Sequence, residues 1–437
     1  MTTDSPRGTP LQKFEEEDLP GGRIPKERYT SHEFAQREWE QMWTRTWLLA
    51  GPVSDLPTTG SYFTFEIGDE SILVVRSAAD RISAFYNVCQ HRASRVVTKP
   101  GCGHTGAFVC PYHLWAYDLD GRLSRVPDRE DFGAGLAEGT RLPQVRTDTW
   151  GGFVFVNLDP AAAPLEEYLG VVPDHLDPYD FENNYALAQD MTFEWECNWK
   201  IGVDAFNEVY HVQGIHPELL DISDDVDCPV DLLGLHSRFL FHVLRPSPRW
   251  TDERARREGY RDRHELTAQV RDILKNMGVD PDGFEGDMRH VRKAMMMRLR
   301  ELGGQGGLDF SQLNDEQLWM DVHYFLFPNV TFNISPGHFW LFRHRPNPRD
   351  PNRMFWDFQE YQRIPRGAER PSRPEHVHAV WGDGRENEIH LALRQDGDAA
   401  GPLQQGMRSR GFEGLVLAHQ ERRIRHFHMN LDRYLEG

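Results

Sequence analysis

The chain has 437 residues, with 49 lysines and arginines against 68 aspartates and glutamates, which gives a formal net charge of −19. A surface this acidic repels nucleic acid and disfavours anionic membranes, so we expect neither as a partner. The mean hydropathy is −0.63, and no apolar run approaches the ~18 residues that a membrane span needs. Because the polar N-terminus also lacks a secretory signal, we expect a cytoplasmic protein.

The N-terminal part of the sequence indicates an arm, a helix and then a β-rich domain. Residues 1–28 are polar and rich in Pro and Gly, so we expect a loosely held arm, and Ser31 is the expected N-cap of the first helix. Short β-rich runs follow from residue 47 to about 159, and residues 160–164 form the expected linker. The expected boundaries are 1–45 for the arm and helix, 46–160 for the β-rich domain and 161–437 for a larger second domain.

The second domain mixes strands and helices in separate runs. Strand patterns and helix patterns that are segregated along the chain predict an α+β domain. The expected elements are strands near 186–197, a helix at 198–215, a charged helical insert between about 251 and 302, antiparallel strands at 321–334, 338–345 and 353–362, and a final helix at 421–435.

Two short clusters in the β-rich part carry metal-ligand chemistry. They are Cys89-Gln90-His91 and Cys110-Pro111-Tyr112-His113, and each offers one thiolate and one imidazole. In a [2Fe–2S] centre of the Rieske type, two Cys hold one iron and two His hold the other. A zinc finger usually presents paired Cys and then paired His, so we favour the iron–sulfur centre over structural zinc. The odd number of remaining cysteines argues against a disulfide framework.

A second set of potential metal ligands lies in residues 198–217, where His211 and His216 are five residues apart. On an ideal helix five residues subtend roughly 140°, so both imidazoles reach one metal only if the helix is distorted or ends between them. Gly214 and Pro217 supply that disruption. Two imidazoles and one carboxylate form the facial triad of mononuclear iron(II), with positions open for dioxygen. A His pair alone would more often be structural.

The two motifs together resemble the large (alpha) terminal oxygenase subunit of Rieske non-haem-iron, aromatic-ring-hydroxylating oxygenases. The first cluster pair resembles the Rieske domain of that family, and Asn198-Trp199-Lys200 followed by Tyr210-His211 and His216 resembles its iron-binding segment. The resemblance implies an α+β chain with an N-terminal all-β Rieske [2Fe–2S] domain inserted after an N-terminal helix. A helix-grip-like catalytic domain, with an antiparallel sheet and flanking helices, would follow. Ala93 and Leu114 stand where the family usually has glycine.

The resemblance also implies roles for individual residues. Glu208 matches the acidic residue that bridges the two redox centres, and we expect it to accept hydrogen bonds from His211 and from His113 of another subunit. Asp204 either supports the same network or orients Tyr210 or a backbone group. The third iron ligand is expected at Asp396, with Asp398 as the alternative. The expected set is Cys89, His91, Cys110 and His113 for the cluster, His211, His216 and Asp396 for iron, and Glu208 and Asp204 as catalytic residues.

The implied activity takes NAD(P)H-derived electrons from a separate reductase, with or without a ferredoxin, through the Rieske cluster to Fe²⁺. There O₂ is activated to hydroxylate a small apolar, aromatic or polycyclic substrate, as in aromatic hydrocarbon catabolism. The sequence contains no Gly-x-Gly-x-x-Gly after a strand, so the nicotinamide site is expected on the partner. Oxidative O- or N-demethylation is one alternative, and a Rieske electron-transfer or ligand-binding protein without catalytic iron is another.

The last expectations concern the oligomeric state, the number of oxygen atoms transferred and the substrate pocket. A homotrimer is expected, whereas a β subunit and the choice between mono- and dioxygenation are left open. Apolar residues of the second domain are candidates for the substrate pocket, with ordinary core packing as the alternative. They are Val203, Phe206, Val212, Ile215, Leu219, Leu220, Phe325, Phe327, Phe332 and Phe339.

Overall fold

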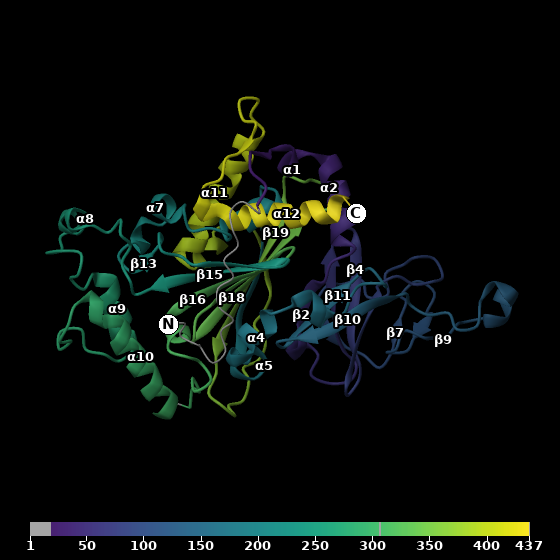
Figure 1. The fold of residues 1–437 in the computed structure, drawn as a ribbon. Coiled ribbons are helices and arrows are strands. Elements are labelled where there is room, and N and C mark those ends of the chain that lie inside the picture. The colour runs from purple at the N-terminus through teal and green to yellow at the C-terminus, as the bar shows by residue number, and fades with distance from the viewer. Residues whose placement is uncertain (1–18, 306, 437) are drawn as a thin grey trace. The chain divides into compact units, whose positions relative to one another are not determined.

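The computed structural model describes residues 19–305 and 307–436. These residues form two compact units, which Figure 1 shows as ribbons. One unit comprises Gln36–Leu169, and the other combines the described residues up to Ala35 with Gly170–Glu436. The first is built mainly of strands and the second of a large sheet with helices, which confirms the expected α+β class. Among the described helices, none is both long enough and apolar enough to cross a membrane.

The Gln36–Leu169 unit contains a seven-stranded antiparallel sheet, in the order β2-β11-β10-β5-β4-β3-β6, and a small sheet of β7-β8-β9. In β3, buried and half-buried residues alternate, as expected for a strand with one face on the core. The strands are β2 Leu48–Pro52, β3 Ser61–Ile67, β4 Glu70–Ala78, β5 Arg81–Tyr86, β6 Cys102–His104, β7 Phe108–Val109, β8 Ala116–Tyr117, β9 Leu123–Arg125, β10 Gln144–Trp150 and β11 Phe153–Asn157.

The other unit is organised around a sheet that has nine strands within the described residues. Its order is β13-β15-β16-β17-β18-β19-β12-β20, with β14 paired to β15. All pairs are antiparallel except β12 with β20. The strands are β12 Tyr185–Trp195, β13 Ser223–Asp224, β14 Val230–Leu233, β15 His236–Val243, β16 Met320–Leu326, β17 Val330–Ile334, β18 His338–Pro346, β19 Met354–Arg363 and β20 Val377–Val380.

Helices of this unit cover the sheet, and the candidate iron ligands lie within one of them or at the ends of another. Figure 1 shows α12, in yellow, lying across the strands, and Phe427 of this helix contacts Phe325 of β16 at 5.5 Å between ring centroids. The helices are α1 Glu27–Thr30, α4 Val172–Leu176, α5 Phe181–Asn184, α6 Trp199–Ala205, α7 Val212–Ile215, α8 Asp252–Arg257, α9 Ala268–Asn276, α10 Met288–Gln305, α11 Leu391–Met407 and α12 Arg422–Glu436. Outside this set, α2 spans His32–Glu38 and α3 spans Leu165–Leu169. The predicted helical insert and final helix are therefore present.

The N-terminal segment is held in place where the structure describes it. Ile24–Pro25 forms β1, which pairs with β21, Gly414–Leu415. The expectation of a loose arm over residues 1–28 is therefore wrong for its described part, because backbone pairing fixes it, and residues 1–18 lie outside the described residues. Ser31 does act as a cap, since its Oγ accepts from the backbone N–H of Phe34 at 3.2 Å.

The predicted helix at 198–215 is interrupted in its middle. Helix α6 ends at Ala205 and α7 begins at Val212. The intervening segment inserts Phe206 beside Phe342, with ring centroids 4.6 Å apart. Tertiary packing of this aromatic residue thus overrides the local helical pattern. A second difference is that the strand expected at 321–334 consists of two strands, β16 and β17.

Candidate metal centres

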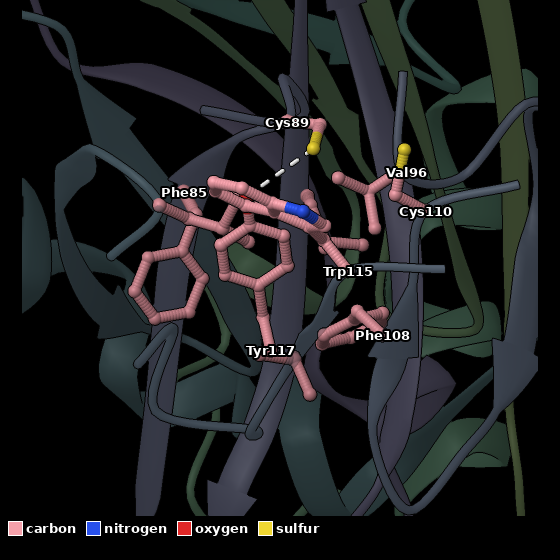
Figure 2. Packing of buried hydrophobic residues seen from close by; sticks show 10 residues of the cluster. Phe85, Cys89, Val96, Phe108, Cys110, Trp115 and Tyr117 are labelled. Carbon is pink, nitrogen blue, oxygen red and sulfur yellow. Dashed lines mark hydrogen bonds between the residues drawn. The ribbon is translucent and has the colours of Figure 1, made fainter. Parts of the chain in front are cut away.

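The two Cys/His loops close in the same way. In each loop the cysteine N–H donates to the carbonyl oxygen five residues later, from Cys89 to Ser94 and from Cys110 to Trp115, both at 2.8 Å. The loops also meet in a common core, where the two cysteines are only 2% and 1% exposed. Figure 2 shows both sulfur atoms at one end of this cluster of buried side chains. The structure therefore brings the two thiols together.

The two imidazoles of these loops also meet. The ring centroids of His91 and His113 are 4.5 Å apart, and His91 stacks on Trp115 at 4.8 Å with an interplanar angle of 9°. His91 Nδ1 is buried and has no hydrogen-bond partner among the described residues. A buried nitrogen without a partner is costly, and coordination to a metal would satisfy it. Paired thiols and paired imidazoles fit a two-iron cluster held by two Cys and two His.

Tyr117 is a residue that the sequence analysis missed at this centre. Its hydroxyl lies 3.3 Å from Cys89 Sγ, which accepts the O–H, and Tyr117 Oη accepts the N–H of Gln90 at 2.9 Å. Burial raises the pKa of the Cys89 thiol, and the hydrogen bond from Tyr117 opposes that effect. Groups that donate to a ligating sulfur tune the metal site. The sequence signal was an aromatic residue on the strand that follows the second loop.

The second centre gathers His211, His216 and Asp396. One ligand atom from each can be chosen so that all three lie within 4.8 Å of one another. Asp396 Oδ1 is 3.0 Å from His216 Nε2 and 3.6 Å from His211 Nε2. His216 and Asp396 are buried, and His211 is half-buried. Two imidazole nitrogens and one carboxylate oxygen are the donor set of a mononuclear non-haem iron site, so the residues present fit that metal.

The outward nitrogens of both histidines are hydrogen-bonded. His211 Nδ1 donates to Glu208 Oε1 at 2.5 Å, and His216 Nδ1 donates to Gln395 Oε1 at 2.7 Å. This leaves Nε2 of each ring directed toward Asp396, the arrangement expected of metal-ligating histidines. Burial lowers the pKa of His211, but the hydrogen bond and charge of Glu208, with Asp396, outweigh it and raise that pKa to about 9. The sequence analysis missed Gln395, whose signal was its position next to Asp396.

The structure gives the two candidate aspartates different surroundings. Both lie on α11, where Asp396 faces the histidines, whereas Asp398 Oδ1 accepts the Trp381 indole N–H at 3.0 Å. Between them, a Cβ on Gly397 would collide with the indole of Trp381, so glycine is what lets this helix pack there. Gly397 lies in the interior of helix α11. The geometry therefore supports Asp396 over Asp398.

Asp204 lies in a buried hydrogen-bond network with Tyr29 and His428. Tyr29 donates its hydroxyl to Asp204 Oδ2 at 2.6 Å and lies 2.7 Å from His428 Nε2. Burial raises the pKa of Asp204 to about 8. Tyr210, the partner considered from the sequence, is 44% exposed. The hydrogen bonds around Asp204 thus involve α1 and α12, while the charge of Glu208 adds to the rise of the Asp204 pKa.

Glu208 borders a cavity as well as the candidate iron site. The cavity has a volume of about 250 Å³ and is lined by residues of four segments: Asn207, Glu208, Val209, Val226, Asp227, Cys228, Pro229, Val230, Phe239, His419, Gln420 and Arg422. The Glu208 side chain is 10% exposed. One carboxylate therefore contacts His211 and also reaches an accessible space.

The two centres coincide with two known domains. The model of the ring-hydroxylating alpha subunit (catalytic domain) matches residues 181–437, and the model of the Rieske [2Fe–2S] domain matches residues 46–145. The fold and the two sites thus define a Rieske-type oxygenase subunit with a [2Fe–2S] cluster and a mononuclear iron as its implied cofactors. The chain belongs to the family of ring-hydroxylating alpha subunits.

Similar proteins include both monooxygenases and dioxygenases. The chain is 37% identical over 211 residues to the glycine betaine monooxygenase oxygenase subunit of Chromohalobacter salexigens, which covers 47% of this chain and 46% of that protein. It is 34% identical over 199 residues to the carnitine monooxygenase oxygenase subunit of Escherichia coli K12, covering 45% and 53%. It is 33% identical over 219 residues to biphenyl 2,3-dioxygenase subunit alpha of Rhodococcus jostii, covering 49% and 47%. The aligned part thus spans about half the length of these curated relatives.

Solved structures show the same fold. A quaternary ammonium Rieske monooxygenase gives a TM-score of 0.69 at 18% identity, covering 97% of this chain and 100% of that chain. Naphthalene 1,2-dioxygenase from a Rhodococcus species gives 0.65 at 18% identity, with 94% of each chain covered.

Proposed function

We propose that this chain is the terminal oxygenase component of a multicomponent system that oxidises an organic substrate with O₂ and reductase-derived electrons. The observation that carries the proposal is the second centre, where ligand atoms of His211, His216 and Asp396 lie within 4.8 Å of one another. An electron-transfer protein without catalytic iron would not need this donor set. We also propose the boundaries 46–160 for the Rieske domain and 161–437 for the catalytic domain, which contain the residues 46–145 and 181–437 matched by the two family models.

The protein's own groups hold and orient the two metal sites. When bound, the cluster supplies single-electron transfer and the mononuclear iron supplies dioxygen activation. Cys89, Cys110, His91 and His113 hold the cluster, and His211, His216 and Asp396 hold the iron. Glu208 keeps a proton on His211 Nδ1 and so leaves Nε2 free as a ligand.

The substrate that we propose first is an aromatic or polycyclic compound. A second candidate is oxidative demethylation of a quaternary ammonium compound, which is favoured by the names of the glycine betaine and carnitine monooxygenase relatives. Both reactions use the same metal sites and differ in the groups that hold the substrate. The proposed partners are a reductase, with or without a ferredoxin, in the cytoplasm.

We also propose that the active assembly is a head-to-tail homotrimer, with or without a β subunit. The second cluster loop presents unusually exposed apolar side chains, since Tyr112 is 54% and Leu114 is 53% exposed on either side of His113. Exposed apolar residues beside a redox ligand are typical of a surface that a partner covers. We expect this loop to approach Glu208 of a second copy, so that Glu208 accepts from both His211 and His113.

Subunit mixing tests this arrangement. A His113→Ala chain lacks the cluster ligand, and an Asp396→Ala chain lacks the iron ligand, so each homo-oligomer should be inactive. Co-expressed with different tags and purified through both, the mixed oligomer should recover part of the turnover, because an intact cluster on one copy meets an intact iron site on another. Full inactivity of the mixed oligomer, at normal metal content, would contradict transfer between copies.

The activity itself is tested with a surrogate reductase. We expect reductase-dependent O₂ consumption with product formation from a panel of aromatic acids, polycyclic hydrocarbons, steroids, glycine betaine and carnitine. Isotopic labelling with ¹⁸O₂ then counts the oxygen atoms incorporated and separates monooxygenation from dioxygenation. Iron bound at His211, His216 and Asp396 with no O₂ consumption on any member of the panel would contradict the proposal.

A further inference from the structure

A row of side chains runs across four neighbouring strands of the nine-stranded sheet. The register pairs His323 of β16 with Asn333 of β17, Asn333 with Trp340 of β18, and Trp340 with Glu360 of β19. Directly opposed residues of antiparallel strands point to the same face of a sheet. His323, Asn333 and Trp340, which we call the polar row, therefore share one face.

This face is the one on which the candidate iron site lies. Arg423 of α12 donates to His323 Nδ1 at 3.4 Å, and the Trp340 ring is 5.4 Å from the ring of His390. His390 is the N-cap of α11, and Asp396 follows on the same helix. Six residues of helix span roughly 9 Å, so the far end of the row lies near the iron ligands. By strand alternation the pocket candidates Phe332 and Phe339 point to the opposite face, where their ring centroids lie 6.0 and 4.6 Å from that of Phe181.

The polar row offers three buried hydrogen-bonding atoms that nothing in the described chain satisfies. They are His323 Nε2, Asn333 Oδ1 and Trp340 Nε1. His323 is 3% exposed, and burial holds its pKa well below the usual value, so the ring is neutral. Because Nδ1 accepts from Arg423, the ring proton is on Nε2. The row therefore presents a donor, an acceptor and a donor on three adjacent strands.

Unpaired polar atoms in a native interior need an explanation, because each is costly to leave without a partner. A site that is built to hydrogen-bond a substrate group rejects analogues that lack the group. A hydroxyl group can donate to Asn333 Oδ1 and accept from a flanking N–H at once. A bare hydrocarbon does neither, and glycine betaine, with a quaternary nitrogen and a carboxylate, can accept but has no proton to donate to Asn333 Oδ1.

We propose that the polar row is a specificity element that recognises a hydroxyl group on the substrate, so that the substrate is an aromatic alcohol rather than a hydrocarbon or glycine betaine. The hydroxyl donates to Asn333 Oδ1 and accepts from Trp340 Nε1 or His323 Nε2. This inference rests on the proposed function, since it assigns the substrate of that iron site.

Binding without turnover tests the inference. The holoprotein, with both metal sites loaded and no reductase, is titrated calorimetrically with three matched pairs: benzene and phenol, naphthalene and 2-naphthol, biphenyl and 4-hydroxybiphenyl. Glycine betaine is titrated in parallel. We expect the alcohol to bind more tightly than its parent by about tenfold in at least one pair, the change in Kd that one well-placed hydrogen bond gives. Glycine betaine should bind more weakly than that alcohol.

Two variants assign the preference to the row. Asn333→Leu removes the acceptor and Trp340→Phe removes one donor while keeping an aromatic ring, and each should reduce the preference for the alcohol. Asn183→Ala, at an exposed asparagine of α5, serves as the control and should keep the full preference. Circular dichroism and iron content confirm that each variant is folded and loaded.

These outcomes distinguish failure of the proposed function from failure of the specificity inference. Failure of the wild-type protein to hold mononuclear iron would overturn the proposed function. Iron-loaded protein that binds no alcohol more tightly than its parent, or that binds glycine betaine most tightly, would overturn only the specificity inference. An alcohol preference that survives in both Asn333→Leu and Trp340→Phe would also overturn it, because the row would not be its source.

Discussion

Ala93 and Leu114 occupy equivalent positions in the two ligand loops. Each lies four residues after the loop cysteine, each donates its N–H to that cysteine's carbonyl oxygen at 3.0 Å, and each has a positive φ, 58° for Ala93 and 61° for Leu114. This left-handed conformation is one that glycine adopts without strain. Both loops thus hold a left-handed residue at this position although neither has a glycine there.

Restoring glycine should therefore stabilise the cluster unit. We expect Ala93→Gly and Leu114→Gly each to raise the free energy of unfolding by about 0.5–1 kcal/mol, because relief of the left-handed strain exceeds the added backbone entropy. Thermal loss of the cluster absorbance measures the change. Ala137→Gly, at an exposed position without a positive φ, is the control and should not stabilise. Destabilisation by both loop variants would show that the Ala93 and Leu114 side chains stabilise the unit by more than their left-handed backbone conformation costs.

Removing the charge of Glu208 should uncouple the two centres without emptying them. In Glu208→Gln the amide oxygen still accepts from His211 Nδ1, but the negative charge beside the imidazole is lost. We expect both metal sites to stay largely filled while reductase-coupled turnover falls by about 10–100-fold, as for other partners of metal ligands. Glu301→Gln, at an exposed glutamate of α10, is the matched control. Wild-type turnover in Glu208→Gln would rule out the bridging role.

The two aspartates of α11 should differ sharply as iron ligands. Asp396→Ala removes the carboxylate that lies 3.0 Å from His216 Nε2, whereas Asp398→Ala removes only the acceptor of the Trp381 indole N–H. We expect Asp396→Ala to lose most of its mononuclear iron and Asp398→Ala to keep it. Iron content per chain, measured with the cluster absorbance as internal standard, checks this. Greater loss of mononuclear iron in Asp398→Ala than in Asp396→Ala would identify Asp398 as the ligand instead.

Asp204 should make stability depend on pH. Burial raises its pKa to about 8, so between the unfolded value of roughly 3.9 and that value the folded state binds a proton that the unfolded state releases. The contribution of Asp204 to stability is therefore fully present below about pH 4 and is lost as the pH rises toward 8. Asp204→Asn should show a higher melting temperature relative to wild type at pH 8 than at pH 5. An equal difference at both pH values, as expected for the exposed control Asp272→Asn, would contradict this assignment.

The sequence predicted the features whose residues are close in the chain. The Cys/His clusters and the pair His211 and His216 are short motifs, so their chemistry is visible without a fold. Asp396 lies 180 residues from His216, and only the resemblance to the family suggested it as a ligand. The hydrogen bond between Tyr29 and Asp204 joins residues 175 apart, and no local pattern indicated it.

The elements that the sequence did not predict were decided by tertiary packing. Helix α11 contains Gly397, Gly401 and Pro402, which are poor helix formers, and its packing on Trp381 compensates for them. The interruption of the predicted helix at 198–215 likewise follows from the burial of Phe206. Which face of a strand points to a site depends on register, and register is not visible in a single strand's pattern.

The metal and sulfide content of the purified chain tests the proposed pair of metal centres most directly. Two irons held by paired Cys and His, with a third at His211, His216 and Asp396, require about three irons and two acid-labile sulfides per chain. Asp396→Ala should lower the count to about two irons with the sulfide unchanged. Zinc without sulfide, or two irons in the wild-type chain with no third site that can be loaded, would contradict the account.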